Sequence, residues 1–405
     1  MIITRQSYLD KLAPFRDKHI IKVLTGVRRA GKSVILEQFK NQLITCGIKE
    51  NQIQFYNFEE PESTELVKED WRTIYQHIKH NLCLEEQNYV FLDEVQNVPE
   101  FQKLVDGLFV KKNIDLYITG SNAYLLSGQL ATLLSGRYVE INVLPLSFAE
   151  YLEFYSDKTD LEHKFADYLY NGSFPQAFEF FASNDSAGID YLRGVYNTVM
   201  IKDVVTRNGA DDANALQKIN RFIFDNVGSL VSPNKIANYM ISHHDKIDSR
   251  KVEKILSAVS DAYIFYPVNR YDIKGKENLQ TLQKYYIVDT GLRRIMLGSD
   301  NNADVGYLLE NVVYLELLRR GCQVWVGKTK DGKEVDFVAM NKNGRIEYYQ
   351  VAATMLGEET RERELSSLCN IDDHYQKFII TMDYGEYSYD GIRQVNVIDW
   401  LLEKW

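Results

Sequence analysis

Short apolar runs and amphipathic stretches alternate through the first 155 residues of the chain. The segments between the runs carry apolar residues at helical spacing. Strands that alternate with helices are typical of a parallel sheet that is covered on both faces. The pattern therefore predicts a parallel α/β sheet domain over residues 1–155. Its five buried strands are expected at 20–25, 52–58, 89–94, 115–122 and 139–143.

The middle of the chain changes to a helical pattern. Residues 156–210 are helical and rich in Tyr and Phe, which predicts a helical linker or lid. Residues 211–300 predict three amphipathic helices, the second of which begins at Pro233 after the N-cap residue Ser232. A hairpin of two short strands is expected to follow. Three helices and a hairpin are a winged helix in outline, so we interpret residues 211–300 as a winged-helix-like domain.

Residues 304–405 mix strands and helices again. A helix over 305–318 carries Glu310, and a strand over 334–339 carries Asp336. Further strands and two helices complete the segment, which predicts a second α/β unit at the carboxyl-terminal end.

Length and composition fit a protein of two or three domains that functions in the cytoplasm. The chain has 405 residues, of which 45% are hydrophobic, and it contains no apolar run long enough to cross a membrane. Its beginning does not read as a signal peptide, and its four cysteines lack metal-site spacing. The net charge of -10 argues against avid non-specific binding to DNA. Residues 211–300 are nevertheless slightly basic, so contact with DNA and docking to a protein both remain open for this segment.

The most informative motif is a glycine-rich loop between a predicted strand and a predicted helix. It fits the phosphate-binding pattern G-x-x-x-x-G-K-[ST], in which backbone N–H groups surround phosphate oxygens. The lysine would reach the β- and γ-phosphates, and the serine would hold Mg²⁺. We expect the lysine to be solvated before nucleotide binds, so that its removal leaves the fold intact. The candidate nucleotide-binding residues of the loop are Gly26, Val27, Arg28, Arg29, Ala30, Gly31, Lys32 and Ser33.

Two adjacent carboxylates end a second apolar strand at Asp93 and Glu94. In a parallel sheet the carboxyl ends of neighbouring strands meet where ligands bind. Asp93 would therefore help Ser33 to orient Mg²⁺, and Glu94 would polarise the attacking water. No Asn-Lys-x-Asp motif is present, so ATP is preferred over GTP as the substrate.

Three further polar residues are candidates with two interpretations each. Ser121 and Asn122 end the next strand and would sense the γ-phosphate, although Gly-Ser-Asn is also ordinary turn sequence. Arg137 is a candidate arginine finger, acting on its own nucleotide or on that of a neighbouring copy in a homo-oligomer. A surface ion pair would explain this arginine equally well.

The chain resembles a prokaryotic family of AAA-type ATPases with a P-loop. The resemblance rests on the loop at 26–33 and on Leu-Asp-Glu-Val-Gln at 92–96. Thr-Gly-Ser at 119–121, Gly-Arg at 136–137 and Pro-Leu-Ser-Phe at 145–148 add to it. The family continues into a winged-helix-like region and a carboxyl-terminal domain of unknown function, so the resemblance covers essentially the whole chain.

The carboxyl-terminal domain resembles a restriction-endonuclease fold, in which a helix glutamate, a strand aspartate and a Glu-x-Lys motif form the site. Glu310 and Asp336 match the first two elements. Gln350 and Ala352 stand where Glu-x-Lys would supply a carboxylate and a cation. Metal-assisted cleavage needs both, so the resemblance implies a nuclease-like fold without nuclease activity. A polar network with a purely structural role would explain Glu310 and Asp336 equally well.

Three functions follow from these residues. An ATPase that acts as a switch or motor, with carboxyl-terminal recognition of a DNA or protein client, explains most of them. An ATP-coupled nuclease is opposed by Gln350 and Ala352. A scaffold that binds ATP without hydrolysing it is opposed by the retained Lys32, Asp93 and Glu94.

Overall fold

A computed structural model describes residues 2–60, 70–123, 136–205, 213–245, 247–298, 305–385 and 387–404, without the side chains at 280 and 281. The chain forms two compact units. Unit 1 comprises Met1–Val143 with Asp261–Tyr263, and unit 2 comprises Leu144–Ser260 with Ile264–Trp405. Residues at two expected domain borders, 206–212 and 299–304, lie outside the described residues.

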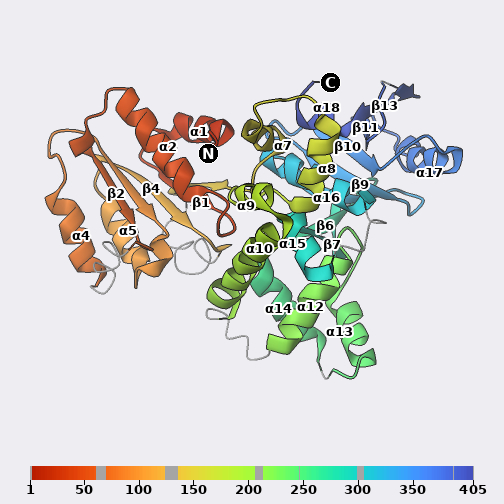
Figure 1. Cartoon of the computed structure of the whole chain (residues 1–405), viewed down its shortest axis with the longest axis horizontal. Coiled ribbons are helices and arrows are strands. Elements are labelled where there is room, and N and C mark those ends of the chain that lie inside the picture. Colours follow the sequence, from red (N-terminus) through yellow and green to blue (C-terminus); the bar gives the residue numbers. More distant parts are fainter. Residues whose placement is uncertain are drawn as a thin grey trace. The chain divides into compact units, whose positions relative to one another are not determined.

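Unit 1 contains the predicted parallel sheet, so the prediction of the α/β fold is confirmed. Its five strands pair in the order β2-β3-β4-β1-β5, and every pair is parallel (Figure 1). The strands are β1 (Ile21–Thr25), β2 (Ile53–Asn57), β3 (Asn88–Asp93), β4 (Ile114–Gly120) and β5 (Tyr138–Asn142).

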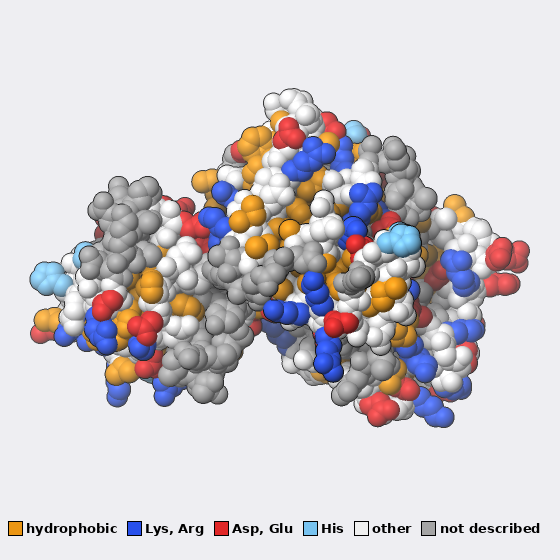
Figure 2. All heavy atoms as spheres, turned by 90° about the horizontal axis from the view of Figure 1, so that it is seen from below, with side chains coloured by type: hydrophobic (Ala, Val, Ile, Leu, Met, Phe, Trp, Pro, Cys, Tyr) orange, Lys and Arg blue, Asp and Glu red, His pale blue; other side chains and the backbone are white. Residues whose placement is uncertain are grey.

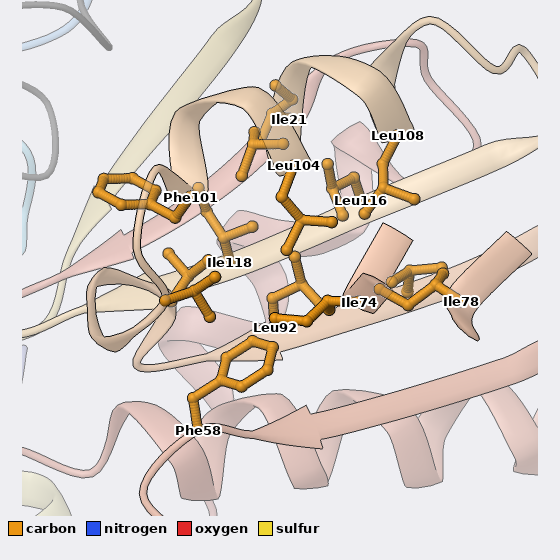
Figure 3. Packing of buried hydrophobic residues seen from close by; sticks show 14 of the residues in the cluster. Ile21, Phe58, Ile74, Ile78, Leu92, Phe101, Leu104, Leu108, Leu116 and Ile118 are labelled. Atoms are coloured by element: carbon orange, nitrogen blue, oxygen red, sulfur yellow. The ribbon is translucent and has the colours of Figure 1, made fainter. Parts of the chain in front are cut away.

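One face of this sheet packs against α4 and α5. Alternate residues of each strand point to this face, which is why Leu92, Leu116 and Ile118 meet Ile74 and Leu104 in one buried cluster (Figure 3). The helices of unit 1 are α1 (Gln6–Leu12), α2 (Lys32–Thr45), α4 (Trp71–His80) and α5 (Phe101–Phe109).

The strand residues that alternate with these point to the other face of the sheet, and some of them are buried polar side chains. Lys22 of β1 forms an ion pair with Asp115 of β4, and neither side chain is exposed. Burial lowers the pKa of Lys22 and raises the pKa of Asp115, while each charge works against the shift of the other. Tyr117 donates a further hydrogen bond to Asp115 over 2.8 Å. Lys22 and Asp115 both lie near the amino ends of their strands, whereas the phosphate-binding loop follows the carboxyl end of β1.

Unit 2 begins with helices, as the pattern predicts. The N-cap at Ser232 is confirmed, because its Oγ accepts a hydrogen bond from the backbone N–H of Lys235 over 3.2 Å. Short helical turns connect several of the longer elements. The helices are α7 (Phe148–Tyr151), α8 (Leu161–Asn171), α9 (Ala177–Ser183), α10 (Asp185–Val199), α12 (Ala213–Asp225), α13 (Pro233–Ser242), α14 (Ser249–Asp261), α15 (Thr290–Leu297), α16 (Val305–Arg319), α17 (Glu358–Cys369) and α18 (Val397–Leu401).

A second sheet follows, with eight strands in the order β12-β13-β11-β10-β9-β8-β6-β7. The hairpin of β6 and β7 comes directly after α14, and β6 pairs in parallel with β8. The expected wing therefore shares a sheet with the carboxyl-terminal strands, and the border between a winged-helix domain and the last domain stays a prediction. The strands are β6 (Phe265–Asp272), β7 (Glu277–Ile287), β8 (Gln323–Lys328), β9 (Glu334–Met340), β10 (Ile346–Ala352), β11 (Gln376–Thr381), β12 (Tyr387–Tyr389) and β13 (Ile392–Asn396).

The surface mixes charges of both signs. On the face drawn in Figure 2, Lys and Arg side chains lie among Asp, Glu and apolar side chains. In the described part of the chain, each helix is too short or too polar to cross a bilayer.

Candidate functional site

The glycine-rich loop connects the end of β1 to the start of α2, which is the strand–loop–helix context that its motif requires. Gly26 has φ 138°, and a Cβ atom there would lie 2.1 Å from the carbonyl oxygen of Val143. Gly31 has φ 97° immediately before the helix. Only glycine adopts these conformations at little cost, so both glycines shape the loop.

Arg5 supports the loop from the amino-terminal segment. Its guanidinium is buried, and Nη1 donates a hydrogen bond to the carbonyl oxygen of Ala30 over 2.9 Å. Its backbone N–H donates to Oε1 of Gln38, a residue of α2. Sequence reasoning missed Arg5, because no local pattern links it to a loop that lies 25 residues further along the chain.

The Lys32 side chain lies inside the loop and is only 3% exposed. Its Nζ donates hydrogen bonds to the carbonyl oxygens of Gly26 and Val27, over 2.9 and 3.1 Å, and lies 3.6 Å from Oε1 of Glu94. The expectation that this lysine is solvated before nucleotide binds was therefore wrong. The loop curls its carbonyl groups around the ammonium, so Lys32 also contributes contacts to the nucleotide-free fold.

Asp93 ends β3 and is fully buried. Thr119 donates a hydrogen bond to its Oδ1, whereas its buried Oδ2 accepts none from the described residues. Burial raises the pKa of this carboxyl to about 6, although the hydroxyls of Ser33 and Thr119 work in the opposite direction. A buried oxygen without a donor, beside a hydroxyl, is suited to meet a cation.

Glu94 follows in the left-handed conformation, with φ 52°. Its backbone N–H donates to Oγ1 of Thr119 over 2.8 Å, and Gln96 donates to its Oε2. Burial works to raise the pKa of Glu94, but the positive charges of Lys32 and Arg28 outweigh that effect, so the pKa lies below its usual value. Glu94 is therefore ionised at neutral pH and faces the phosphate-binding loop.

The predicted neighbours at the end of β4 also reach the site. Ser121 and Asn122 are buried, and Nε2 of Gln96 donates to Oγ of Ser121 over 3.3 Å. This contact joins the end of β4 to the side chain that holds Glu94. Their role as sensors of the γ-phosphate stays a prediction.

Sequence reasoning assigned no role to Thr119 or Gln96. Thr119 holds both the Asp93 carboxylate and the Glu94 backbone, and Gln96 bridges Glu94 and Ser121. Both residues stand in the motifs that carry the family resemblance, and this was the available signal.

Arg137 is not brought to this site. It immediately precedes β5, whose first residue Tyr138 pairs with the first residue of β1, whereas the glycine-rich loop follows the last residue of β1. Its Nη1 lies 3.3 Å from Oδ1 of Asp106, and the Arg137 side chain is 49% exposed. The arginine thus lies beside the amino ends of the strands, and its own loop lies at their carboxyl ends. A role of Arg137 toward a neighbouring copy stays a prediction.

The second predicted cluster lies in unit 2. Glu310 of α16 and Asp336 of β9 approach the same lysine, Lys284. Gln350 accepts a hydrogen bond from the backbone N–H of Asp336 and donates one to Glu364 over 2.8 Å. Its amide therefore holds the strands and the helix α17 together.

A magnesium ion that arrives with a nucleotide fits the residues of the loop. Such an ion keeps most of its oxygen ligands from water and phosphates and needs only one or two from the protein. The Ser33 hydroxyl and the unpartnered Oδ2 of Asp93 are the groups that would supply these. Within the described ranges, no group of three or more His, Cys, Asp and Glu side chains is arranged to hold a metal by itself.

Three family models together cover most of the chain. The model described as an AAA domain matches residues 18–152. Two models described as domains of unknown function match residues 162–303 and 305–401. These assign no fold to the carboxyl-terminal part, so its likeness to restriction endonucleases stays a prediction.

Similar proteins extend over the full chain. An uncharacterized protein of Haemophilus influenzae is 41% identical over 409 residues, which covers 99% of each chain. An uncharacterized protein of Methanocaldococcus jannaschii is 29% identical over 395 residues, covering 94% of this chain and 85% of the other. Among solved structures, a Walker-type ATPase of Pyrococcus abyssi superposes with a TM-score of 0.50 at 17% identity, covering 73% of this chain and 96% of that one, which supports the fold.

Proposed function

The chain belongs to the same protein family as the Haemophilus influenzae protein and carries an AAA-type ATPase domain, and from this premise we propose that it binds and hydrolyses Mg-ATP as a molecular switch or motor. The observation that carries the proposal is the convergence of Lys32 and Glu94 on one loop, with their charged atoms 3.6 Å apart. A scaffold that only held nucleotide would need the lysine but not the carboxylate.

Binding begins at the loop backbone and at the start of α2. The first N–H groups of a helix have no acceptor within the helix and carry partial positive charge, so those at the start of α2 attract phosphate oxygens. Lys32 exchanges the carbonyl oxygens of Gly26 and Val27 for the β- and γ-phosphates. Ser33 and Asp93 would hold the Mg²⁺ that accompanies the nucleotide, which would supply positive charge at the phosphates.

Hydrolysis then depends on Glu94. Its low pKa keeps it ionised, so that it accepts a hydrogen bond from the attacking water and orients that water toward the γ-phosphate. Because Glu94 faces Lys32 in the nucleotide-free chain, ATP must separate the two charges before the carboxylate meets water. Gln96 and Ser121 link this change to the end of β4, which provides a route from the nucleotide to the rest of the chain.

Phosphate release from ATP, measured with purified protein and Mg²⁺, tests the proposal. Turnover that requires Mg²⁺ supports an ATPase. Tight ATP binding without phosphate release would support the scaffold instead. The client, a DNA or a protein, would be sought by affinity purification of a Glu94→Gln chain from native cells.

We expect that the carboxyl-terminal domain does not cut DNA. The Gln350 amide accepts a hydrogen bond from the backbone N–H of Asp336 and donates one to Glu364, and Ala352 carries no cation. An attacking water would therefore lack the groups that activate it. Supercoiled and linear DNA, incubated with the protein, ATP and Mg²⁺ or Mn²⁺, should remain intact. Cleavage that disappears in Asp336→Ala would contradict this expectation, and any binding without cleavage should weaken steeply with salt.

Arg137→Ala tests for an arginine finger between copies of the chain. If Arg137 completes the site of a neighbour, the wild-type rate per chain rises with protein concentration, and the variant loses that rise together with about 10³-fold in turnover. Initial rates over a dilution series measure both quantities. An unchanged rate and an unchanged concentration dependence would leave Arg137 as a surface partner of Asp106.

A further inference from the structure

One buried lysine of unit 2 is surrounded by three carboxylates, away from the nucleotide site. Nζ of Lys284, a residue of β7, lies 2.8 Å from Oε1 of Glu310 on α16 and 2.6 Å from Oε1 of Glu334 on β9. It lies 3.6 Å from Oδ1 of Asp336, two residues further along β9. The three acidic side chains come from two elements that pack together only in the folded chain.

The cluster is buried and carries excess negative charge. The side chain of Lys284 is 3% exposed, and Glu310 and Asp336 are buried with it. One ammonium faces three acidic side chains, those of Glu310, Glu334 and Asp336. The single positive charge of Lys284 therefore does not neutralise all the acidic groups of the cluster.

The buried carboxylates are positioned by groups other than the lysine. Tyr286 donates a hydrogen bond to Oε1 of Glu310, and the backbone N–H of Val351 donates to Oδ2 of Asp336 over 2.8 Å. Oxygen ligands that are fixed by their own hydrogen bonds are typical of sites for hard cations. The acidic groups would therefore keep their places if the ammonium were removed.

We propose that the ammonium of Lys284 is the resident cation of a carboxylate site that would otherwise bind a divalent metal ion, and that this lysine keeps the site free of metal. Within the described ranges, no group of three or more His, Cys, Asp and Glu side chains is arranged to hold a metal ion, and this includes the cluster around Lys284. The N···O distances of an ammonium exceed metal–oxygen distances by several tenths of an ångström, so the acidic side chains would have to move inward to bind a metal ion. Glu334 is 35% exposed, so it has the freedom to swing inward.

The proposal goes beyond the ATPase and concerns a separate site. An ammonium in the place of a metal ion is a physical reason, in addition to the missing Glu-x-Lys residues, to expect no metal-assisted hydrolysis at this cluster. The proposal also explains a buried lysine that the nucleotide site does not use. Since Lys284 lies on the hairpin strand β7, the same ion pairs hold that strand to α16 and β9.

Removal of the lysine should open the site to a metal. Lys284→Ala leaves buried carboxylates without their cation, so its unfolding temperature should fall. Millimolar Mn²⁺ or Ca²⁺ should then raise the unfolding temperature of the variant by about 5 °C or more, because an ion that binds only the folded chain stabilises it. Wild-type protein should show no comparable shift, and Lys284→Ala with Asp336→Asn should lose most of it.

Lys22→Ala is a matched control within the same chain. Lys22 is a buried lysine too, but it pairs with the single carboxylate of Asp115. Its replacement should destabilise the protein without creating a metal site. Mn²⁺ or Ca²⁺ at the same ionic strength should therefore leave the unfolding temperature of this variant unchanged.

Lys284→Gln provides a second variant, because its amide keeps two hydrogen-bond donors but no charge. If either variant is unfolded without metal, recovery of native circular dichroism on addition of Mn²⁺ supports the proposal. The proposal is overturned if neither variant gains stability or fold from the divalent ions. It is equally overturned if wild type or Lys22→Ala gains as much as the Lys284 variants.

Discussion

Lys32→Ala is expected to weaken ATP binding on the order of 10²-fold or more, since it removes the cation that faces the β- and γ-phosphates. The loop backbone would still offer its N–H groups, but the ammonium that Lys32 places inside the loop would be lost. Titration calorimetry with ATP and Mg²⁺ measures the loss. A folded Lys32→Ala chain with wild-type affinity would contradict the assignment of the loop.

The same substitution should also lower the free energy of unfolding, by about 1–3 kcal/mol. Lys32 is buried and satisfies two carbonyl groups, and its absence leaves the buried Glu94 with Arg28 at 4.0 Å as its remaining positive neighbour. Lys40→Ala is the matched control, because it removes a partly exposed lysine from the same helix. Its ATP affinity and stability should stay close to wild type, which separates a local effect of Lys32 from a loss of helix charge.

Hydrophobic periodicity was sufficient to predict the fold of unit 1. Strands that are buried on both faces read as mainly apolar runs, and β1, β3 and β4 are of this kind. Lys22 and Asp115 interrupt the runs of β1 and β4, and they form a buried ion pair with each other. The helix at Pro233 was equally predictable, since its cap and first residue are adjacent in sequence. The partner of the hairpin was not, because pairing of β6 with β8 depends on residues more than 50 positions apart.

The same distinction applies to the candidate site. The loop and Asp93 were identified because short motifs encode them, and the parallel sheet places both at one edge. The burial of Lys32 could not be foreseen, since it depends on how the loop carbonyls curl. The sequence made Arg137 a candidate arginine finger. The register of β5 with β1 instead places Arg137 near the amino end of β1, whereas the loop follows the carboxyl end of that strand.

Glu94→Gln should separate ATP binding from turnover. The amide keeps the shape of the side chain but cannot act as a carboxylate toward water, so hydrolysis should fall on the order of 10²-fold or more. Binding should be retained, because the carboxylate that now faces Lys32 at 3.6 Å loses its charge and competes less with the γ-phosphate for that lysine. Calorimetry gives the affinity, and single-turnover phosphate release gives the chemical step without product release.

Glu59→Gln is the control that distinguishes a base from a general loss of negative charge. Glu59 pairs with Arg28 of the same loop at 2.5 Å, and its side chain is 41% exposed, whereas Glu94 is buried beside Lys32. If Glu94 acts on water, Glu59→Gln should hydrolyse ATP within a few-fold of wild type while Glu94→Gln does not. Equal losses in both variants would mean that the carboxylates only tune the charge of the loop. Wild-type turnover in Glu94→Gln would place the base on another residue.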